Sequence, residues 1–147
     1  MSVSPGPEIR GWFEPERLDV ASGAPFAVEL VVRNDGDADA FVFVPTGRAE
    51  GLEIEVLEGA DYALAGLENE PDVGLVGERR LAPGEMYRQE FPLSRWLRLG
   101  APGRYIVECR IRVQASDRSA REGGGTALAV EVASPIELNV LPEEAER

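Results

Sequence analysis

The sequence predicts an all-β protein whose strands form an antiparallel sandwich of two sheets. Hydrophobic and polar residues alternate along one short run after another, which is the pattern of strands with one buried face. Clusters of Gly, Pro, Asn and Asp separate these runs, whereas helical periodicity is almost missing. We therefore expect about seven to nine strands and one short helical turn, which is the content of a two-sheet sandwich.

The first strands are marked by alternation and by breaks. Residues 9–13 and 18–20 read as a first strand that Pro15 interrupts, a common protection of a sheet edge. Residues 26–33 alternate cleanly and end at the turn sequence of residues 34–37. These runs predict an edge strand, and a second strand that ends in a turn.

Two further strands follow before the pattern weakens. Residues 41–44 are apolar on both faces, which indicates a central strand that stops at Pro45. In residues 52–56, apolar residues alternate with glutamates, which predicts a strand with one solvent-facing side. Residues 59–77 have no clear period, and we expect a long connection there with room for one short strand.

A strand at residues 86–91 follows the turn at residues 81–85, and a helical turn comes next. Ser94 is a suitable N-cap for that turn, which ends at Gly100. Within the turn, Trp96 and its neighbours are placed to close one end of the core.

The clearest strand of the chain begins at about residue 104. One of its faces is rich in arginine, and the other is apolar and consists of Tyr105, Val107, Cys109, Ile111 and Val113. Residues 115–126 then predict a glycine-containing loop, and residues 128–140 return as a strand with a break at Pro135.

Length and composition fit one domain over residues 1–147, with a polar tail from about residue 142. The chain has no histidine and no lysine, which removes imidazole bases and Schiff-base lysines from the candidate chemistry. Its net charge of −12 disfavours nucleic acid and anionic membranes as partners. We expect a protein that is not an enzyme and has no cofactor.

The chain opens without a basic segment followed by an apolar run, and no apolar stretch approaches the length of a membrane span. As written, this indicates a cytoplasmic protein, or a secreted one if a signal peptide was removed. Cys109 is the single cysteine and lies on the inward face of its strand by parity. We expect a buried, unreactive thiol.

Asp35, Asp37 and Asp39 have the alternating spacing with which a calcium loop begins. An EF-hand would continue with Gly and Glu where this chain has Ala40 and Thr46. We therefore expect a solvated acidic turn and no metal, and keep these three aspartates as the candidate ligands.

Two other groups of residues have a functional and a structural interpretation. The first group is a row of arginines, Arg104, Arg110 and Arg112, which could bind an acidic ligand. We favour the structural interpretation, in which they pair across strands with Glu53, Glu55 or Glu131. The second group is Trp12 and Trp96, which could stack on a sugar. The chain has few aromatic residues and needs most of them for its core, so we favour a core role for both.

We place the partner-binding surface in the segment of residues 59–77. A long connection without firm secondary structure is usually functional or disordered. Its apolar residues flank an acidic centre, which favours a partly packed loop that is open to a partner. The candidate residues are Tyr62, Leu64, Leu67, Val73, Leu75 and Val76. The alternative is that they cap the open end of the sandwich.

Several turn sequences resemble those of bacterial immunoglobulin-like sandwich domains. Asn34 ends a strand before a turn, Pro83-Gly84-Glu85 opens another, and Tyr105 follows a Pro-Gly pair, all in the order of that family. The pattern is also similar to the bacterial intracellular proteinase inhibitor family and to accessory domains of secreted peptidases. The resemblance covers about half of the chain and implies an immunoglobulin-like antiparallel β-sandwich.

These observations predict a non-catalytic protein-interaction or binding module, whose partner is another protein or a second copy of the chain. The resemblance and the long connection support an alternative, a proteinase inhibitor that presents a surface loop. A small carboxylate-dependent hydrolase is an alternative of another class, although no two acids are bound to converge in a pocket.

Overall fold

The computed structural model describes residues 8–45, 51–59, 61–65, 78–118 and 127–142, and these residues form two facing β-sheets and one small two-stranded sheet. The first sheet is antiparallel and consists, in order, of β1 (Ile9–Glu14), β3 (Val28–Asn34) and β8 (Met86–Phe91).

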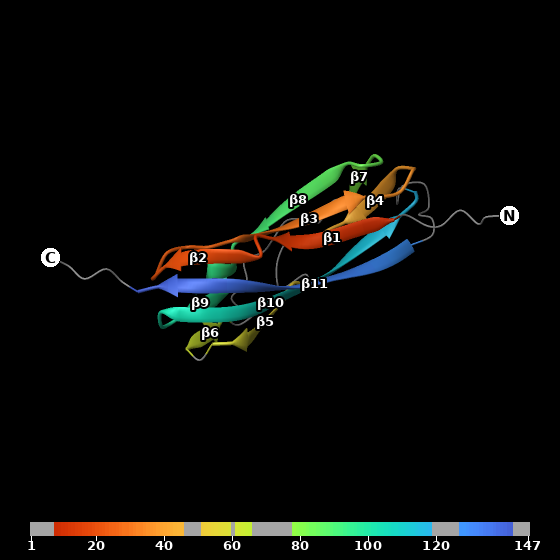
Figure 1. Cartoon of the computed structure of the whole chain (residues 1–147). Helices are drawn as coiled ribbons and strands as arrows, with labels where there is room; N and C mark the ends of the chain where they lie inside the picture. The colour runs from red at the N-terminus through yellow and green to blue at the C-terminus, as the bar shows by residue number, and fades with distance from the viewer. Residues whose placement is uncertain (1–7, 46–50, 60, 66–77, 119–126, 143–147) are drawn as a thin grey trace.

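The second sheet is built around a long hairpin. Its strands are, in order, β2 (Arg17–Ala21), β11 (Ala127–Leu141), β10 (Gly103–Ser116), β4 (Ala40–Phe43) and β7 (Glu78–Leu81), with β5 (Glu53–Glu58) also paired to β10. Strand β2 runs parallel to β11, and the other described pairs of this sheet are antiparallel. Figure 1 shows β1, β3 and β8 as a layer above the β10–β11 hairpin.

This order confirms the immunoglobulin-like all-β sandwich. Strands β1, β3 and β8 correspond to strands A, B and E of such a domain, and β4, β10 and β11 correspond to C, F and G. The helical content of the described residues is one 3₁₀ turn, η3 (Leu93–Arg95).

The described residues contain eleven strands, above the number expected from the alternation. One reason is that the run interrupted by Pro15 becomes two strands in different sheets, β1 and β2. Another is a separate antiparallel pair of three-residue strands, β6 (Tyr62–Leu64) and β9 (Leu97–Leu99). Strand β6 is the one short strand that was expected within residues 59–77.

The prediction of a helical turn from Ser94 to Gly100 was wrong in its extent. The turn covers only η3, and the Ser94 hydroxyl does not cap it but accepts a hydrogen bond from the Phe26 amide at 3.0 Å. Residues 97–99 are extended instead, because pairing with the distant strand β6 outweighs the local helical preference.

One core joins the two sheets, and the predicted faces of β10 are confirmed. The apolar residues of β10 from Tyr105 to Val113 are all buried, while Arg104, Arg112 and Gln114 are exposed. The largest fully buried side chains of the core include Leu30, Phe91, Ile111, Ile136 and Leu138.

Two residues behind the immunoglobulin-like resemblance hold the ends of this core. The buried Asn34 side chain donates hydrogen bonds to the carbonyls of Ala38 and Leu81, both at 2.8 Å, and accepts one from the Gly36 amide. The Tyr105 hydroxyl lies 2.8 Å from the Ala101 carbonyl, as in the tyrosine corner of immunoglobulin domains.

Parts of three predictions lie outside the described residues. These are most of the connection at residues 59–77, most of the loop at residues 115–126, and the polar tail after residue 142. Within the described part of the predicted loop, β10 continues to Ser116 because it still pairs there with β4 and β11.

Candidate binding groove

The chain changes sheets at Pro15, and this leaves two strand edges side by side. Strand β1 ends at Glu14 in the first sheet, and β2 begins at Arg17 in the second. Strand β2 pairs only with residues 137–141 of β11. Before residue 137, β11 therefore has no strand on that side among the described residues.

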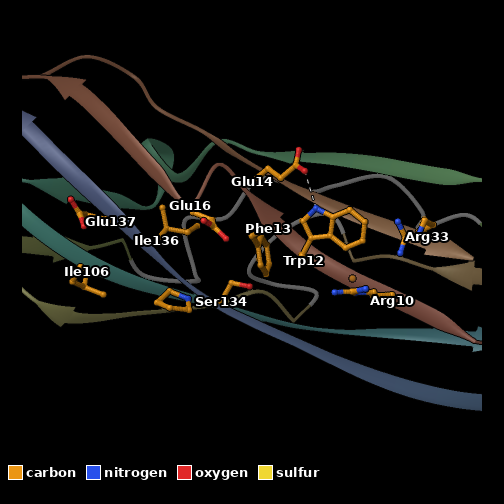
Figure 2. Close-up of a pocket in the computed structure, with 12 residues that line it drawn as sticks. Arg10, Trp12, Phe13, Glu14, Glu16, Arg33, Ile106, Ser134, Ile136 and Glu137 are labelled. Carbon is orange, nitrogen blue, oxygen red and sulfur yellow. Dashed lines mark hydrogen bonds between the residues drawn. The ribbon is translucent and has the colours of Figure 1, made fainter. Parts of the chain in front are cut away.

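A groove of about 850 Å³ lies between these two edges. That volume is in the range of ligand-binding pockets. It is lined by Arg10, Gly11, Trp12, Phe13, Glu14, Glu16, Arg33, Ile106, Ser134, Pro135, Ile136 and Glu137. Figure 2 shows Arg10, Trp12 and Arg33 together at one end of the groove, and Ile106, Ile136 and Glu137 toward the other.

Strand β1 directs backbone groups into the groove. The Glu8 carbonyl accepts a hydrogen bond from the Asp35 amide, so even-numbered residues of β1 face β3. Because the bonding direction alternates along an antiparallel strand, Gly11 and Phe13 point their N–H and C=O groups away from β3. Neither residue has a backbone partner on that side within the described part of the chain.

Strand β11 does the same from the other sheet. The Glu137 amide donates to the Glu16 carbonyl at 2.9 Å, so odd-numbered residues of β11 face the side of β2. Ala133 and Pro135 face that side beyond the start of β2, and both are exposed. Proline is tolerated at residue 135 because its missing N–H would point to this open edge rather than to β10.

Trp12 forms one end of the groove and is held by its neighbours. Its indole N–H donates to the Glu14 carboxylate at 2.8 Å. The guanidinium groups of Arg10 and Arg33 lie 5.9 and 5.2 Å from the centre of the indole ring. Contacts of this kind are attractive and fix the ring in place.

The outer face of the first sheet supports this arrangement. In the register of the sheet, Trp12 lies opposite Val31, and Val31 lies opposite Arg88. Val31 is fully buried although it points outward. Arg88 donates to both Glu14 and Glu29, which ties the three strands together across this face.

Most charged groups that line the groove are already paired. The Trp12 indole and Arg88 lower the pKa of Glu14, and the Arg17 guanidinium followed by Asn139 lowers that of Glu137. Arg33 is paired with Asp35, whose pKa it lowers.

Arg10 and Glu16 differ from these groups. Within the described part of the chain, neither side chain has a hydrogen bond or an ion pair, apart from the contact of Arg10 with the Trp12 ring. They are therefore the charged side chains of the groove that could form an ion pair with a ligand.

Two carboxylates of the groove and the thiol of the core are held in fixed protonation states. The chain has no histidine or lysine, and the carboxylates of Glu14 and Glu137 are held ionised as hydrogen-bond acceptors. Cys109 lies in the core, where burial and the charge of Glu108 raise the pKa of its thiol to about 12. A thiol with that pKa is a poor nucleophile at neutral pH.

The structure does not bring the three candidate aspartates together as ligands. Asp35 is bound by Arg33, Asp39 is bound by Arg80, and Asp37 is exposed. The described residues contain no group of three acidic or cysteine side chains placed to hold a metal ion.

Of the predicted partner-binding residues, Tyr62 and Leu64 lie in β6 and are 43% and 39% exposed. Leu57, just before them in β5, is 52% exposed. The remaining candidates, Leu67, Val73, Leu75 and Val76, lie outside the described residues. The interaction surface at residues 59–77 stays a prediction.

The arginine row of β10 pairs across strands, as favoured. Arg110 makes its shortest ion pair within its own strand, to Glu108 at 2.6 Å. Across strands it approaches Glu53 and Glu131 to within 4.0 and 3.9 Å, and Arg112 approaches Glu131 at 3.9 Å. Arg104 pairs with Glu58 on β5 at 3.1 Å and with Glu137 on β11 at 3.5 Å. Of the two tryptophans, Trp96 is buried in the core, whereas Trp12 lies half-buried in the groove.

Sequence reasoning missed the groove, although two signals of it are present. Arg10, Trp12 and Glu14 share the outward face of their strand, which is an unusual place for a tryptophan. The proline that follows them marks the point where the chain leaves the first sheet.

Fold and groove together define an immunoglobulin-like β-sandwich with an open edge. No protein-family model matches the chain, and no curated protein matches it. In the described residues, no helix is long and apolar enough to cross a membrane.

The solved structures that are similar to this chain include the following three. The ASH/PapD-like domain 7 of human CEP192 has 12% identity and a TM-score of 0.39, over 98% of this chain and 92% of that one. WR4, a C. elegans MSP family member, has 11% identity and a TM-score of 0.35, over 87% and 94%. The Salmonella enterica SafA pilin in complex with the SafB chaperone has 11% identity and a TM-score of 0.35, over 95% and 57%.

Proposed function

We propose that this chain is a non-catalytic protein-binding module that takes an extended segment of a partner protein into the groove between β1 and β11. One observation carries the proposal. The free edges of both strands meet at the same groove, which Gly11 and Phe13 line on one side and Pro135 on the other. Ala133 lies two residues before Pro135 on the same open edge of β11.

An added strand is the natural occupant of such a site. Unpaired N–H and C=O groups at a sheet edge provide affinity, while pockets for side chains provide specificity. No described strand pairs with β11 on that side before residue 137, so an added strand would continue the line of β2. Trp12, which is rigid and amphipathic, suits the role of a side-chain contact at the end of that strand.

A proline substitution tests the backbone contact directly. The N–H of Ala133 points to the open edge, so Ala133→Pro removes the group that the partner would use but no hydrogen bond to β10. Met86→Pro is the matched control, because Met86 is exposed and its N–H points to the free edge of β8, away from the groove.

The probe is a set of peptides selected from a random peptide library for binding to the unaltered chain. We expect Ala133→Pro to weaken their binding about tenfold, because it removes a hydrogen bond and obstructs the edge, and Met86→Pro to leave it unchanged. Equal binding to the unaltered chain and to Ala133→Pro contradicts the proposal. A library that yields no binder also contradicts it.

A further inference from the structure

Arg10 faces a second positive charge across the strands. In the register of the first sheet it lies directly opposite Arg33, and like charges at opposed positions repel each other. Asp35 forms a two-point ion pair with Arg33, with nitrogen–oxygen distances of 2.5 and 3.3 Å. Arg10 forms no ion pair in the described residues, although its charge, after that of Arg33, also lowers the pKa of Asp35. Two arginines and one aspartate therefore leave one positive charge at this corner.

The hydrogen-bonding capacity of Arg10 is also unused. A guanidinium group has five N–H donors in a planar fork that fits a carboxylate. The described contact of this group is with the face of the Trp12 ring, which holds the guanidinium without using its N–H donors. Figure 2 shows the Arg10 side chain beside the Trp12 ring at the end of the groove.

The opposite end of the groove has the opposite charge. Glu16 lines the groove between Phe13 and Ile136, as Figure 2 shows, and its carboxylate has no hydrogen bond or ion pair among the described residues. Glu137 beside it is already bound by Arg17. A segment that was acidic along its whole length would meet these two glutamates, so negative charge is favourable only at the Arg10 end.

We infer that the segment bound in the groove carries an aspartate or glutamate side chain that pairs with Arg10, followed by neutral or basic residues toward Glu16. The inference rests on the proposed function and names the chemistry of the partner. Charge-assisted hydrogen bonds between arginine and a carboxylate are about twice as strong as neutral ones, which accounts for a preference of this kind.

Charge reversal at Arg10 separates binding from folding. In Arg10→Glu the new carboxylate faces Arg33 across the strands, but it gives up the contact with the Trp12 ring and the attraction to Asp35. These effects oppose each other, so we expect the melting temperature to stay within about 4 °C of that of the unaltered chain, which thermal unfolding checks first. A loss of binding in that variant therefore has no cause in unfolding. Arg98→Glu is the matched control, since Arg98 is exposed on β9 and does not line the groove.

The probes are three labelled peptides with one alternating Thr-Val frame, acetylated and amidated so that no terminal charge remains. They carry Glu, Gln or Lys at one end, and each is made with that residue first or last. Binding is measured by fluorescence anisotropy at low salt. We expect the Glu peptide to bind the unaltered chain about tenfold more tightly than the Gln peptide, and the Lys peptide to bind least.

In Arg10→Glu we expect the order of the Glu and Lys peptides to reverse, whereas Arg98→Glu keeps the original order. An unchanged order in Arg10→Glu overturns the inference about the acidic side chain. The proposed function still stands in that case if Ala133→Pro weakens all three peptides. If Ala133→Pro has no effect, or none of the peptides binds, the proposed function fails and the inference falls with it.

Discussion

The side-chain amide of Asn34 donates a hydrogen bond to the carbonyl of Leu81 at 2.8 Å, which joins the end of β3 in one sheet to the end of β7 in the other. The same amide group bonds the Ala38 carbonyl, and Asn34 is fully buried. A side chain with a donor pair and an acceptor is needed at this point, because three backbone groups converge on it.

Asn34→Ala is expected to destabilise the domain by about 2–3 kcal/mol, because it leaves buried carbonyl groups without donors. Asn34→Asp is expected to cost at least as much, since its carboxylate cannot donate to Leu81. The free energy of unfolding in urea measures both. Asp37→Ala, an exposed change in the following turn, serves as the control and shifts the stability by less than about 0.5 kcal/mol.

The thiol of Cys109 makes the stability depend on pH in alkaline solution. Its pKa rises from an ordinary value of about 9 to about 12 in the folded chain, first through burial and then through Glu108. Between these values the unfolded chain loses the thiol proton and the folded chain keeps it. The unfolded state then binds fewer protons, so stability falls as the pH rises.

We therefore expect the advantage of the unaltered chain over Cys109→Ala to shrink between about pH 9 and pH 11, by up to about 1.4 kcal/mol per pH unit. Urea unfolding of both chains at several pH values measures the difference. A difference that is constant over this range would show that the thiol ionises as readily in the folded chain as in the unfolded one.

Gly11 allows β1 to approach β11 closely. A Cβ atom at residue 11 would lie 2.6 Å from a methyl group of Val132, which is buried. Gly11→Ala is expected to destabilise the chain by about 1–3 kcal/mol through overpacking. Adding Val132→Ala removes the methyl group that the new Cβ atom would meet, so it should restore part of the lost free energy of unfolding. The effects of the two changes are then not additive. Thermal unfolding of the two single variants and the double variant tests the coupling, and strict additivity would argue against the contact.

The exposed pair Tyr62 and Leu64 tests the interaction surface predicted from the segment at residues 59–77. Replacing both with Ser is expected to reduce self-association or partner binding without loss of stability, because neither side chain is buried. Light scattering over a range of concentrations measures self-association. Leu128→Ser removes an equally exposed side chain from β11 and is the control. If association is unchanged by the double replacement, the surface lies elsewhere.

The sequence predicts a strand of this fold well when the alternation of apolar and polar residues is complete within that strand. In β10 the alternation from Tyr105 to Val113 is complete, and every inward residue is buried as expected. The turns around Asn34 and Tyr105 are also local, since Asn34 bonds Gly36 and Ala38, and Tyr105 bonds Ala101.

Features that depend on distant partners escaped prediction. Residues 97–99 became a strand because β6 lies beside them, more than thirty positions earlier in the chain. The groove depends on which sheet each half of the first run joins, and the break at Pro15 reveals that a change occurs but not its destination. The remaining candidates for partner binding lie outside the described residues.

The parallel pairing of β2 with β11 has a mechanical consequence. The chain enters the pair at Arg17 and leaves it at Leu141, and both strands run in the same direction. A force that pulls these two ends apart slides the strands along each other, so it loads the bonds between Arg17–Ala21 and residues 137–141 together rather than peeling them off one at a time. When the domain is stretched between residues 17 and 141, this pair resists through five residue pairs beside the groove.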